Sequence, residues 1–188
     1  FDELQSAFAK EIDWFSDRMV ACVTRVEKMH EKLLPTPFLS AVVDDCLADG
    51  KDVTQGGAHY NFAGVQAIQV ANLADSLASI KKLVYDDKKL AGEALLHALQ
   101  TNFQDAPMLR AELLNKVPKY GNDVKWVDEL GAKWVNYFAD GLKKYRNGRG
   151  GIYQMGLYTV SAHVPMGQNV GASADGRYAK DPLADGGV

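Results

Sequence analysis

The sequence predicts a helix-rich chain of the α/β class, and three observations lead to this prediction. Several long stretches carry apolar residues at steps of three and four, the spacing of one face of an α-helix. A run near the C-terminal end, residues 152–160, contains the β-branched and aromatic residues that favour strands. With 188 residues, 47% of them apolar, the chain is also long enough to bury a core.

The first predicted helix covers residues 1–34 and is followed by a short second helix. Pro35 and Pro37 end the first one, because a proline clashes with the preceding helical turn. Thr36 is predicted to cap the second helix, which ends at Gly50. The apolar stripe of the first helix consists of Phe1, Leu4, Phe8, Ile12, Phe15, Met19, Val23 and Val26.

A loop with paired glycines, residues 51–61, precedes a series of further helices. The first of these is predicted over residues 62–84, where many small side chains indicate close packing against neighbouring elements. The strand predicted near the C-terminal end follows the glycine-rich turn at residues 147–151. Because a single strand cannot form a sheet, we expect partner strands outside this sequence. The remaining helices are predicted at residues 86–103, 106–116 and 123–145, and the turn at 147–151.

The composition argues against several classes of function. A net charge of −3 provides no general field for binding nucleic acid, and no apolar stretch approaches the roughly 20 residues that span a bilayer. Cys22 and Cys46 lack the Cys-x-x-Cys spacing of zinc and redox sites. The sequence does not open with the basic region of a secretory leader. We therefore expect a cytoplasmic protein without a membrane or nucleic-acid partner.

The segment GGAHYNF, residues 56–62, allows two interpretations. Its glycines could admit a phosphate at a helix N-terminus, but the spacing of known phosphate loops is missing. The simpler interpretation is a tight connection in which Asn61 caps the next helix. His59 is a candidate acid or base, although an isolated histidine more often makes a structural hydrogen bond. Asp44 and Asp45 are predicted to lie on a solvated face.

Other polar residues give weak signals for chemistry. His30, His97 and His163 are far apart in the sequence and have no second ligand at a helical spacing, so no metal site is expected. The guanidinium of Arg177 could clamp a phosphate or carboxylate. The more ordinary alternative is a turn at 175–176 with Arg177 in an ion pair. No motif pairs a nucleophile with a base.

Residues 157–163 (LYTVSAH) are predicted to form a strand whose side chains alternate between two faces. Buried hydroxyl groups need hydrogen-bond partners, so a small polar face suits a ligand pocket as well as it suits packing. One face would carry Thr159, Ser161 and His163, and the other Tyr158, Val160 and Ala162.

Taken in order, several segments resemble the glycyl radical enzymes, the family of pyruvate formate-lyase. They cover essentially the whole chain, and no single one of them is decisive. The segments are residues 35–40 (PTPFLS), 56–62 (GGAHYNF), 74–84 (ADSLASIKKLV), 119–123 (KYGND), 174–177 (ADGR) and 182–188 (PLADGGV).

The resemblance implies a segment of a ten-stranded α/β barrel in which two loops meet at the centre. One loop carries a catalytic cysteine and a glutamate, and the other carries the glycine that stores the radical. Neither pattern occurs in this sequence, so the resemblance places them outside it and implies that the 188 residues alone are inactive. Residues 1–188 would form part of one barrel domain. Residues 1–150 would be mainly helical, and residues 151–188 would supply a barrel strand and a loop leading toward the glycyl radical domain.

Within the family, the segments PTPFLS, GGAHYNF and PLADGGV are more similar to the branch that eliminates a leaving group. The resemblance thus implies a lyase or dehydratase that cleaves a C–O, C–N or C–S bond of a small polar substrate. The alternatives are formate C-acetyltransferase (pyruvate formate-lyase) and arylacetate decarboxylase. An alternative of a different class, a non-enzymatic helical scaffold or interaction module, is favoured by the lack of a nucleophile–base set.

The resemblance also implies a substrate site and partners. One face of the 157–163 strand would line the substrate cavity, and alternation does not decide which face. The hydroxyl groups favour Thr159 and Ser161, and the full candidate set is Thr159, Ser161, Tyr158 and His163. No cofactor or metal would bind directly. An activating enzyme that uses S-adenosylmethionine and an iron–sulfur cluster would install the glycyl radical, and the enzyme is expected to be a homodimer.

Overall fold

The computed structural model of the chain describes residues 1–158 and 161–186. Its residues group into two compact units. Unit 1 comprises Phe1 together with residues 66–136 and 157–188, and unit 2 comprises residues 2–65 and 137–156. No helix among the described residues combines the length and the apolar character that a membrane span requires.

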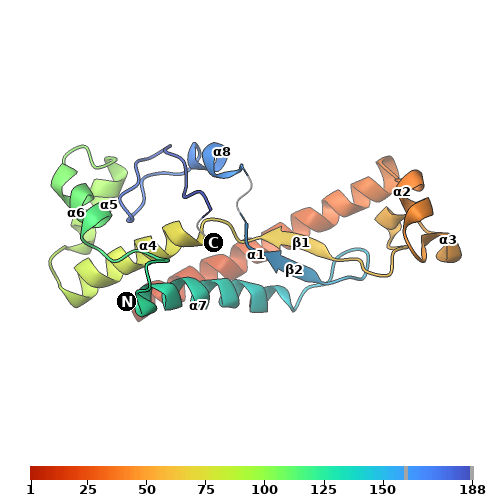
Figure 1. Ribbon diagram of the computed structural model, residues 1–188, viewed down its shortest axis with the longest axis horizontal. Coiled ribbons are helices and arrows are strands. Elements are labelled where there is room, and N and C mark those ends of the chain that lie inside the picture. Colours follow the sequence, from red (N-terminus) through yellow and green to blue (C-terminus); the bar gives the residue numbers. More distant parts are fainter. Residues whose placement is uncertain (159–160, 187–188) are drawn as a thin grey trace. The chain divides into compact units, whose positions relative to one another are not determined.

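Unit 2 begins with the long helix α1, Asp2–Leu33, as the apolar periodicity predicts (Figure 1). The short helix α2, Pro37–Val42, follows with a proline in its first turn, where the missing N–H costs nothing. A second short helix, α3, Cys46–Asp49, ends at Gly50 in the left-handed region. The predicted stop of the first helix and the glycine end at residue 50 are therefore confirmed. The single helix predicted between them is wrong, because it is divided between Val42 and Cys46, and the Thr36 side chain does not cap it. The loop then forms the 3₁₀ turn η1, Val53–Gln55.

Two short strands pair in the chain: β1, Ala63–Gln66, and β2, Tyr153–Gly156 (Figure 1). The backbone N–H of Ala63 donates to the carbonyl oxygen of Ile152 at 3.0 Å. The expectation of a single strand without a partner in this sequence is therefore wrong.

The predicted helix over residues 62–84 is wrong at its start, because α4 begins only at Val70 and ends at Ile80. Small residues such as Gly64 fit a tightly packed helix as well as a strand, which explains the error. Burial alternates along β1, with Ala63 and Val65 buried and the next residue in each case exposed. That two-residue period is the period of a strand.

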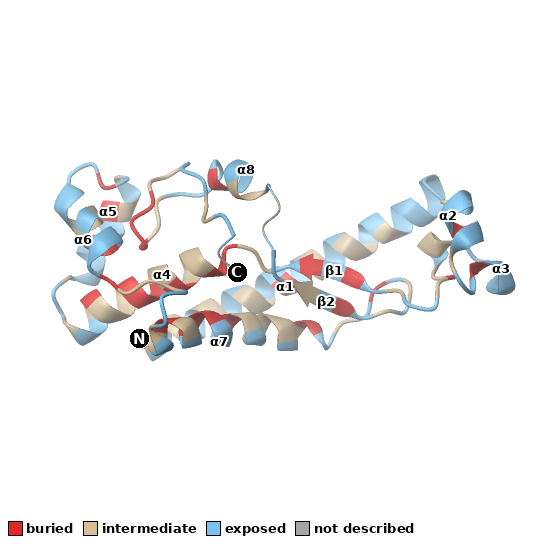
Figure 2. Cartoon of the chain, in the orientation of Figure 1, coloured by how far each residue is buried: buried red, intermediate tan, exposed pale blue. Residues whose placement is uncertain are grey.

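The core of unit 2 lies where the sheet contacts helices. Its fully buried members are Ala63, Val65, Leu142 and Tyr153, and Figure 2 shows buried positions along β1. Partly buried side chains from α1 and from the C-terminal part of α7 complete it; they are Met19, Val20, Val23 and Phe138. The apolar stripe predicted for the first helix thus contributes to a real core.

Unit 1 is helical. Its most buried element is α4, in which Ala74 and Ala78 are fully inaccessible (Figure 2), so the prediction of a closely packed, small-residue helix is confirmed for this part. Its other elements are the π-helix η2 (Lys81–Asp86), α5 (Gly92–Gln100), α6 (Pro107–Asn115), α7 (Lys125–Leu142) and α8 (His163–Gly167). The part of α7 from Tyr137 onward belongs to unit 2.

Candidate functional site

A single carboxylate, Asp52, ties the loop before β1 to α2. Its Oδ1 accepts hydrogen bonds from the Thr54 backbone N–H at 2.9 Å and from the Thr54 hydroxyl at 2.6 Å. Its Oδ2 accepts from Ser40 Oγ at 2.7 Å and from the Thr36 backbone N–H at 3.0 Å. The Thr54 and Ser40 hydroxyl groups hold the pKa of this carboxyl well below its usual range. Asp52 therefore fastens the PTPFLS segment to the start of the glycine loop.

The paired glycines let two parts of the loop backbone approach closely. A Cβ on Gly57 would lie 2.1 Å from the carbonyl oxygen of Lys51, which no side chain tolerates. Asn61 Nδ2 donates to the carbonyl oxygens of Ala58, at 2.8 Å, and Gly56, at 3.3 Å. The interpretation of this segment as a tight connection is confirmed. The expected helix cap at Asn61 is wrong, because a strand follows it.

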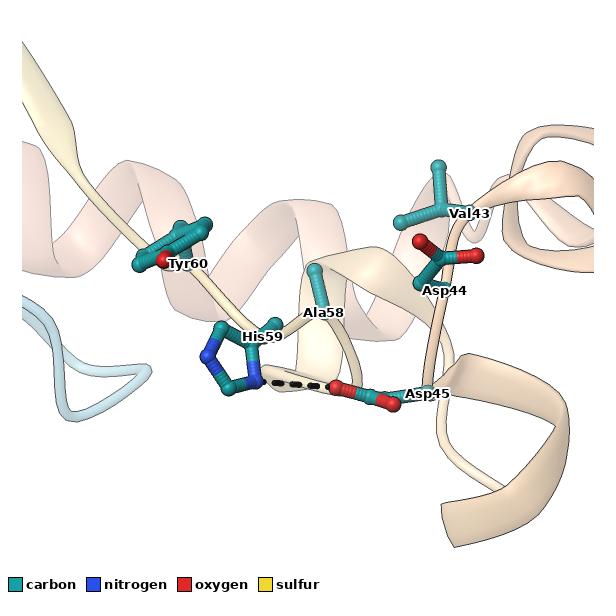
Figure 3. A pocket seen from close by; sticks show the side chains of 6 residues that line it. All are labelled: Val43, Asp44, Asp45, Ala58, His59 and Tyr60. Carbon is teal, nitrogen blue, oxygen red and sulfur yellow. Dashed lines mark hydrogen bonds and ion pairs between the residues drawn. The ribbon is translucent and has the colours of Figure 1, made fainter.

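His59 and Asp45 contact each other and both line a surface hollow of about 570 Å³ (Figure 3). His59 Nδ1 lies 3.0 Å from Asp45 Oδ2, and the two side chains are 67% and 47% exposed. The Tyr60 ring packs edge-on against the imidazole, with centroids 4.6 Å apart. A contact this exposed to water is only weakly stabilising, so the geometry favours a structural hydrogen bond over a catalytic acid or base.

The turn at residues 147–151 sets the alignment of the two strands. The buried Asn147 side chain donates from Nδ2 to the Asn61 carbonyl oxygen at 2.5 Å. Its Oδ1 accepts from the backbone N–H groups of Arg149, at 3.0 Å, and Gly151, at 2.8 Å. A Cβ on Gly151 would lie 1.8 Å from the same Asn61 carbonyl oxygen. Glycine is therefore required where β2 begins beside β1.

In unit 1 the buried carboxylate of Asp175 joins segments more than 100 residues apart. Its Oδ2 accepts from Asn72 Nδ2 at 2.5 Å, and its Oδ1 accepts from Ser173 Oγ at 2.6 Å. Asn72 Oδ1 in turn accepts from the Ala184 backbone N–H at 2.7 Å. Asp175 and Ala184 are thereby both held to Asn72 of α4.

Arg177 is bound within its own loop. The guanidinium donates to the carbonyl oxygens of Tyr178, at 2.8 Å, and Asp181, at 2.9 Å, and also to that of Gly171. The expected turn at 175–176 is confirmed, with Gly176 at a φ of +96°. Among the residues that the structure describes, the expected ion pair of Arg177 is not formed, because carbonyl oxygens and the Ser173 hydroxyl take the place of a carboxylate.

Asp75 lines a second hollow, of about 470 Å³, together with Arg110, Lys119 and residues of the ADGR segment. Burial raises the pKa of the Asp75 carboxyl, although Oδ1 accepts from the Tyr120 backbone N–H at 2.7 Å and Lys119 Nζ lies 3.9 Å from Oδ2. This contact joins the ADSL segment to the KYGND segment. Among the described residues, no group of three or more His, Cys, Asp and Glu side chains is placed to hold a metal ion.

The predicted strand over residues 157–163 is wrong for the part of that range that the structure describes, residues 157–158 and 161–163. The strand pairs at Tyr153–Gly156 instead, because β1 is only four residues long and pairing starts directly after the Asn147 turn. Residues 161–162 form a turn, and His163 starts α8, in which Pro165 lies in the first turn. The alternation that grouped Ser161 with His163 on one face therefore does not apply.

The four predicted site residues have different surroundings. The Tyr158 hydroxyl accepts a hydrogen bond from Gln66 Nε2 at 3.0 Å, just beyond the ends of the two strands. Ser161 is exposed in its turn, and Thr159 lies outside the described residues. His163 Nδ1 is buried without a hydrogen-bond partner among the described residues, and Asp185 Oδ1 is 3.7 Å away. Sequence analysis missed Gln66, for which the sequence offers no signal.

Comparison with known proteins identifies the family. The family model for pyruvate formate lyase-like proteins matches residues 1–167. The (2S)-3-sulfopropanediol dehydratase of Klebsiella oxytoca is 37% identical over 187 residues, which cover 98% of this chain and 22% of the relative. The chain thus spans about a quarter of the length of such relatives.

Two solved structures agree closely with the fold. A structure that describes 1,2-propanediol dehydration in Roseburia inulinivorans matches with a TM-score of 0.93 and 41% identity, over 98% of this chain and 24% of that one. The glycerol-bound, B12-independent glycerol dehydratase of Clostridium butyricum matches with a TM-score of 0.93 and 39% identity, over 98% of this chain and 23% of that one. The expected resemblance and fold class are therefore confirmed. The chain belongs to the pyruvate formate lyase-like family of glycyl radical enzymes and is a helix-rich segment of its α/β barrel.

Proposed function

We propose that the full-length protein is a glycyl radical lyase of the dehydratase type, acting on a small polar substrate. The observation that carries this proposal is the 37–41% identity to proteins whose names specify dehydration of sulfopropanediol, 1,2-propanediol or glycerol. These three substrates carry neighbouring hydroxyl groups, so cleavage of a C–O bond is favoured over cleavage of a C–N or C–S bond.

In the proposed reaction a cysteine thiyl radical abstracts a hydrogen atom from one substrate carbon. The hydroxyl group on that carbon releases a proton, the hydroxyl group on the adjacent carbon takes up a proton and departs as water, and the product radical takes a hydrogen atom back from the cysteine thiol. A glutamate assists the proton transfer. We place the cysteine, the glutamate and the radical glycine in polypeptide beyond these 188 residues, and we expect the 188 residues alone to be inactive. The contribution of this chain is then to shape and line the substrate cavity.

We propose that the substrate-binding residues of this chain include Tyr158, Ser161, His163 and Thr159. Two observations support the set: the Tyr158 hydroxyl lies just past the strand ends, and the His163 ring nitrogen is buried with no hydrogen-bond partner among the described residues. Buried polar atoms normally have partners, so a ligand group would complete this one.

Four further parts of the proposal follow from family membership. Residues 1–188 form part of one barrel domain, with residues 1–150 mainly helical and residues 151–188 leading toward the glycyl radical domain. An activating enzyme with an iron–sulfur cluster uses S-adenosylmethionine to install the radical. The enzyme is a homodimer. It works in the cytoplasm.

The test is turnover by the full-length, activated enzyme under anaerobic conditions. Glycerol, 1,2-propanediol, choline, isethionate and trans-4-hydroxyproline are offered separately, and aldehyde, imine or amine products and the released leaving group are followed. We expect turnover of a vicinal diol to its aldehyde. No turnover of any of the five, together with acetyl-CoA and formate formed from pyruvate and coenzyme A, would assign the protein to the acyltransferase branch.

A further inference from the structure

Gln69 adopts a backbone conformation that its side chain disfavours. Its φ of +66° and ψ of 37° place it in the left-handed region, between the end of β1 and the first turn of α4. Residues other than glycine, asparagine and aspartate seldom adopt this region. Such strain persists only where the surroundings impose it, and it gathers at ligand sites.

The amide of Gln69 is also unusual in being buried and unpaired. The residue is 7% exposed, and neither Oε1 nor Nε2 has a hydrogen-bond partner among the described residues. The side chain does not cap α4 either. Native proteins leave few buried polar groups unpaired, because each costs the free energy of removing it from water. Within the described residues, no hydrogen bond of the Gln69 side chain compensates for the backbone strain and for the loss of hydration.

The position of Gln69 points to the substrate side of the fold. It lies three residues after Gln66, the last residue of β1, whose amide donates to the Tyr158 hydroxyl at 3.0 Å. Connections from the end of a strand to the start of a helix supply many of the binding residues of α/β proteins, since rigid elements hold them in place.

We propose that the side-chain amide of Gln69 binds the substrate of the full-length enzyme and helps to determine which substrate is accepted. This inference rests on the proposed function and extends it. The amide offers one acceptor and two donors and carries no charge. It therefore suits a hydroxyl group, which both donates and accepts, better than a carboxylate or an ammonium group.

The test uses the full-length, activated enzyme with Gln69→Met, which keeps the length of the side chain and removes its polar atoms. Gln100→Met, at the exposed end of α5, is the matched control. We expect Gln69→Met to melt at or above the wild-type temperature, because a buried unpaired amide, which costs free energy, is replaced by an apolar group. The glycyl radical signal in electron paramagnetic resonance should also be unchanged. KM for the diol should rise about tenfold, the worth of one or two hydrogen bonds, and Gln100→Met should behave as wild type.

Two results would overturn the inference. An unchanged KM and kcat with full radical content would show that the substrate does not contact the amide. A lowered melting temperature with an unchanged KM would assign the amide to polypeptide outside this sequence. If Gln69→Met does not fold, Gln69→Gly, which tolerates the left-handed backbone, replaces it, and a wild-type KM in that variant is equally decisive. If the wild-type enzyme turns over none of the five candidate substrates, the proposed function itself fails, and this inference with it.

Discussion

The pairing of β1 with β2 should depend on one side chain, that of Asn147. Replacing it by alanine removes three hydrogen bonds, one to the Asn61 carbonyl oxygen and two from the N–H groups of Arg149 and Gly151. Asn147 is 6% exposed, so water does not readily replace these bonds. Each buried group left unpaired costs about 1–3 kcal/mol, and because such terms do not simply add, we expect a loss of about 3 kcal/mol in local stability.

Hydrogen exchange measured by mass spectrometry on the full-length protein reads out this loss. About 3 kcal/mol corresponds to roughly 150-fold faster exchange in the segments 61–66 and 147–156. The Ala63 amide, which donates to Ile152, should report it most directly. Asn122→Ala is the control, because that exposed side chain makes one long bond of 3.4 Å, to the Lys119 carbonyl oxygen. Unchanged exchange in both segments of the Asn147 variant would refute the reasoning.

Three further outcomes are expected. Gly57→Ala should destabilise the protein by roughly 1–3 kcal/mol in thermal unfolding, because its Cβ would meet the Lys51 carbonyl oxygen, whereas Gly64→Ala, whose Cβ meets nothing within 4 Å, should not. The pKa of Asp52 is depressed in the folded state, so its stabilisation is complete above about pH 4 and is lost below it. Urea midpoints of wild type and Asp52→Asn should therefore converge as the pH falls, and parallel curves would contradict this. Burial raises the pKa of Asp75, so wild-type stability should decline as the pH rises from about 4 through the folded value. Asp75→Asn should remove that decline and melt higher at neutral pH, and a lower melting temperature there would count against it.

Much of the helical framework could be predicted from the sequence, because local patterns dictate it. The stripe of residues 1–34, the proline stop at Pro35 and the glycine end at Gly50 all act within a few residues. The capping-box spacing of Asp52 and Gln55 is a further local signal, and it specifies the turn η1. The strand β1 was not predictable in this way, because the Asn147 side chain, 86 residues away, holds it in place.

The candidate site was less predictable than the fold. The tail strand was expected at residues 157–163, since β-prone residues continue there, but the short length of β1 limits pairing to Tyr153–Gly156. The contact of Asp45 with His59 depends on the left-handed backbone of Asp45, which neither residue signals. The strain and isolation of Gln69 likewise became visible only in three dimensions.

The distance along the chain between the two strands also affects how the protein emerges from the ribosome. β1 finds its hydrogen-bond partner only after the segment around Asn147 has been synthesised, 86 residues later. At about 5–20 residues per second, the edge of β1 that pairs with β2 stays unpaired for roughly 4–17 s. A lengthened or more apolar β1 would therefore give chaperones more to shield during translation, which favours keeping this strand short.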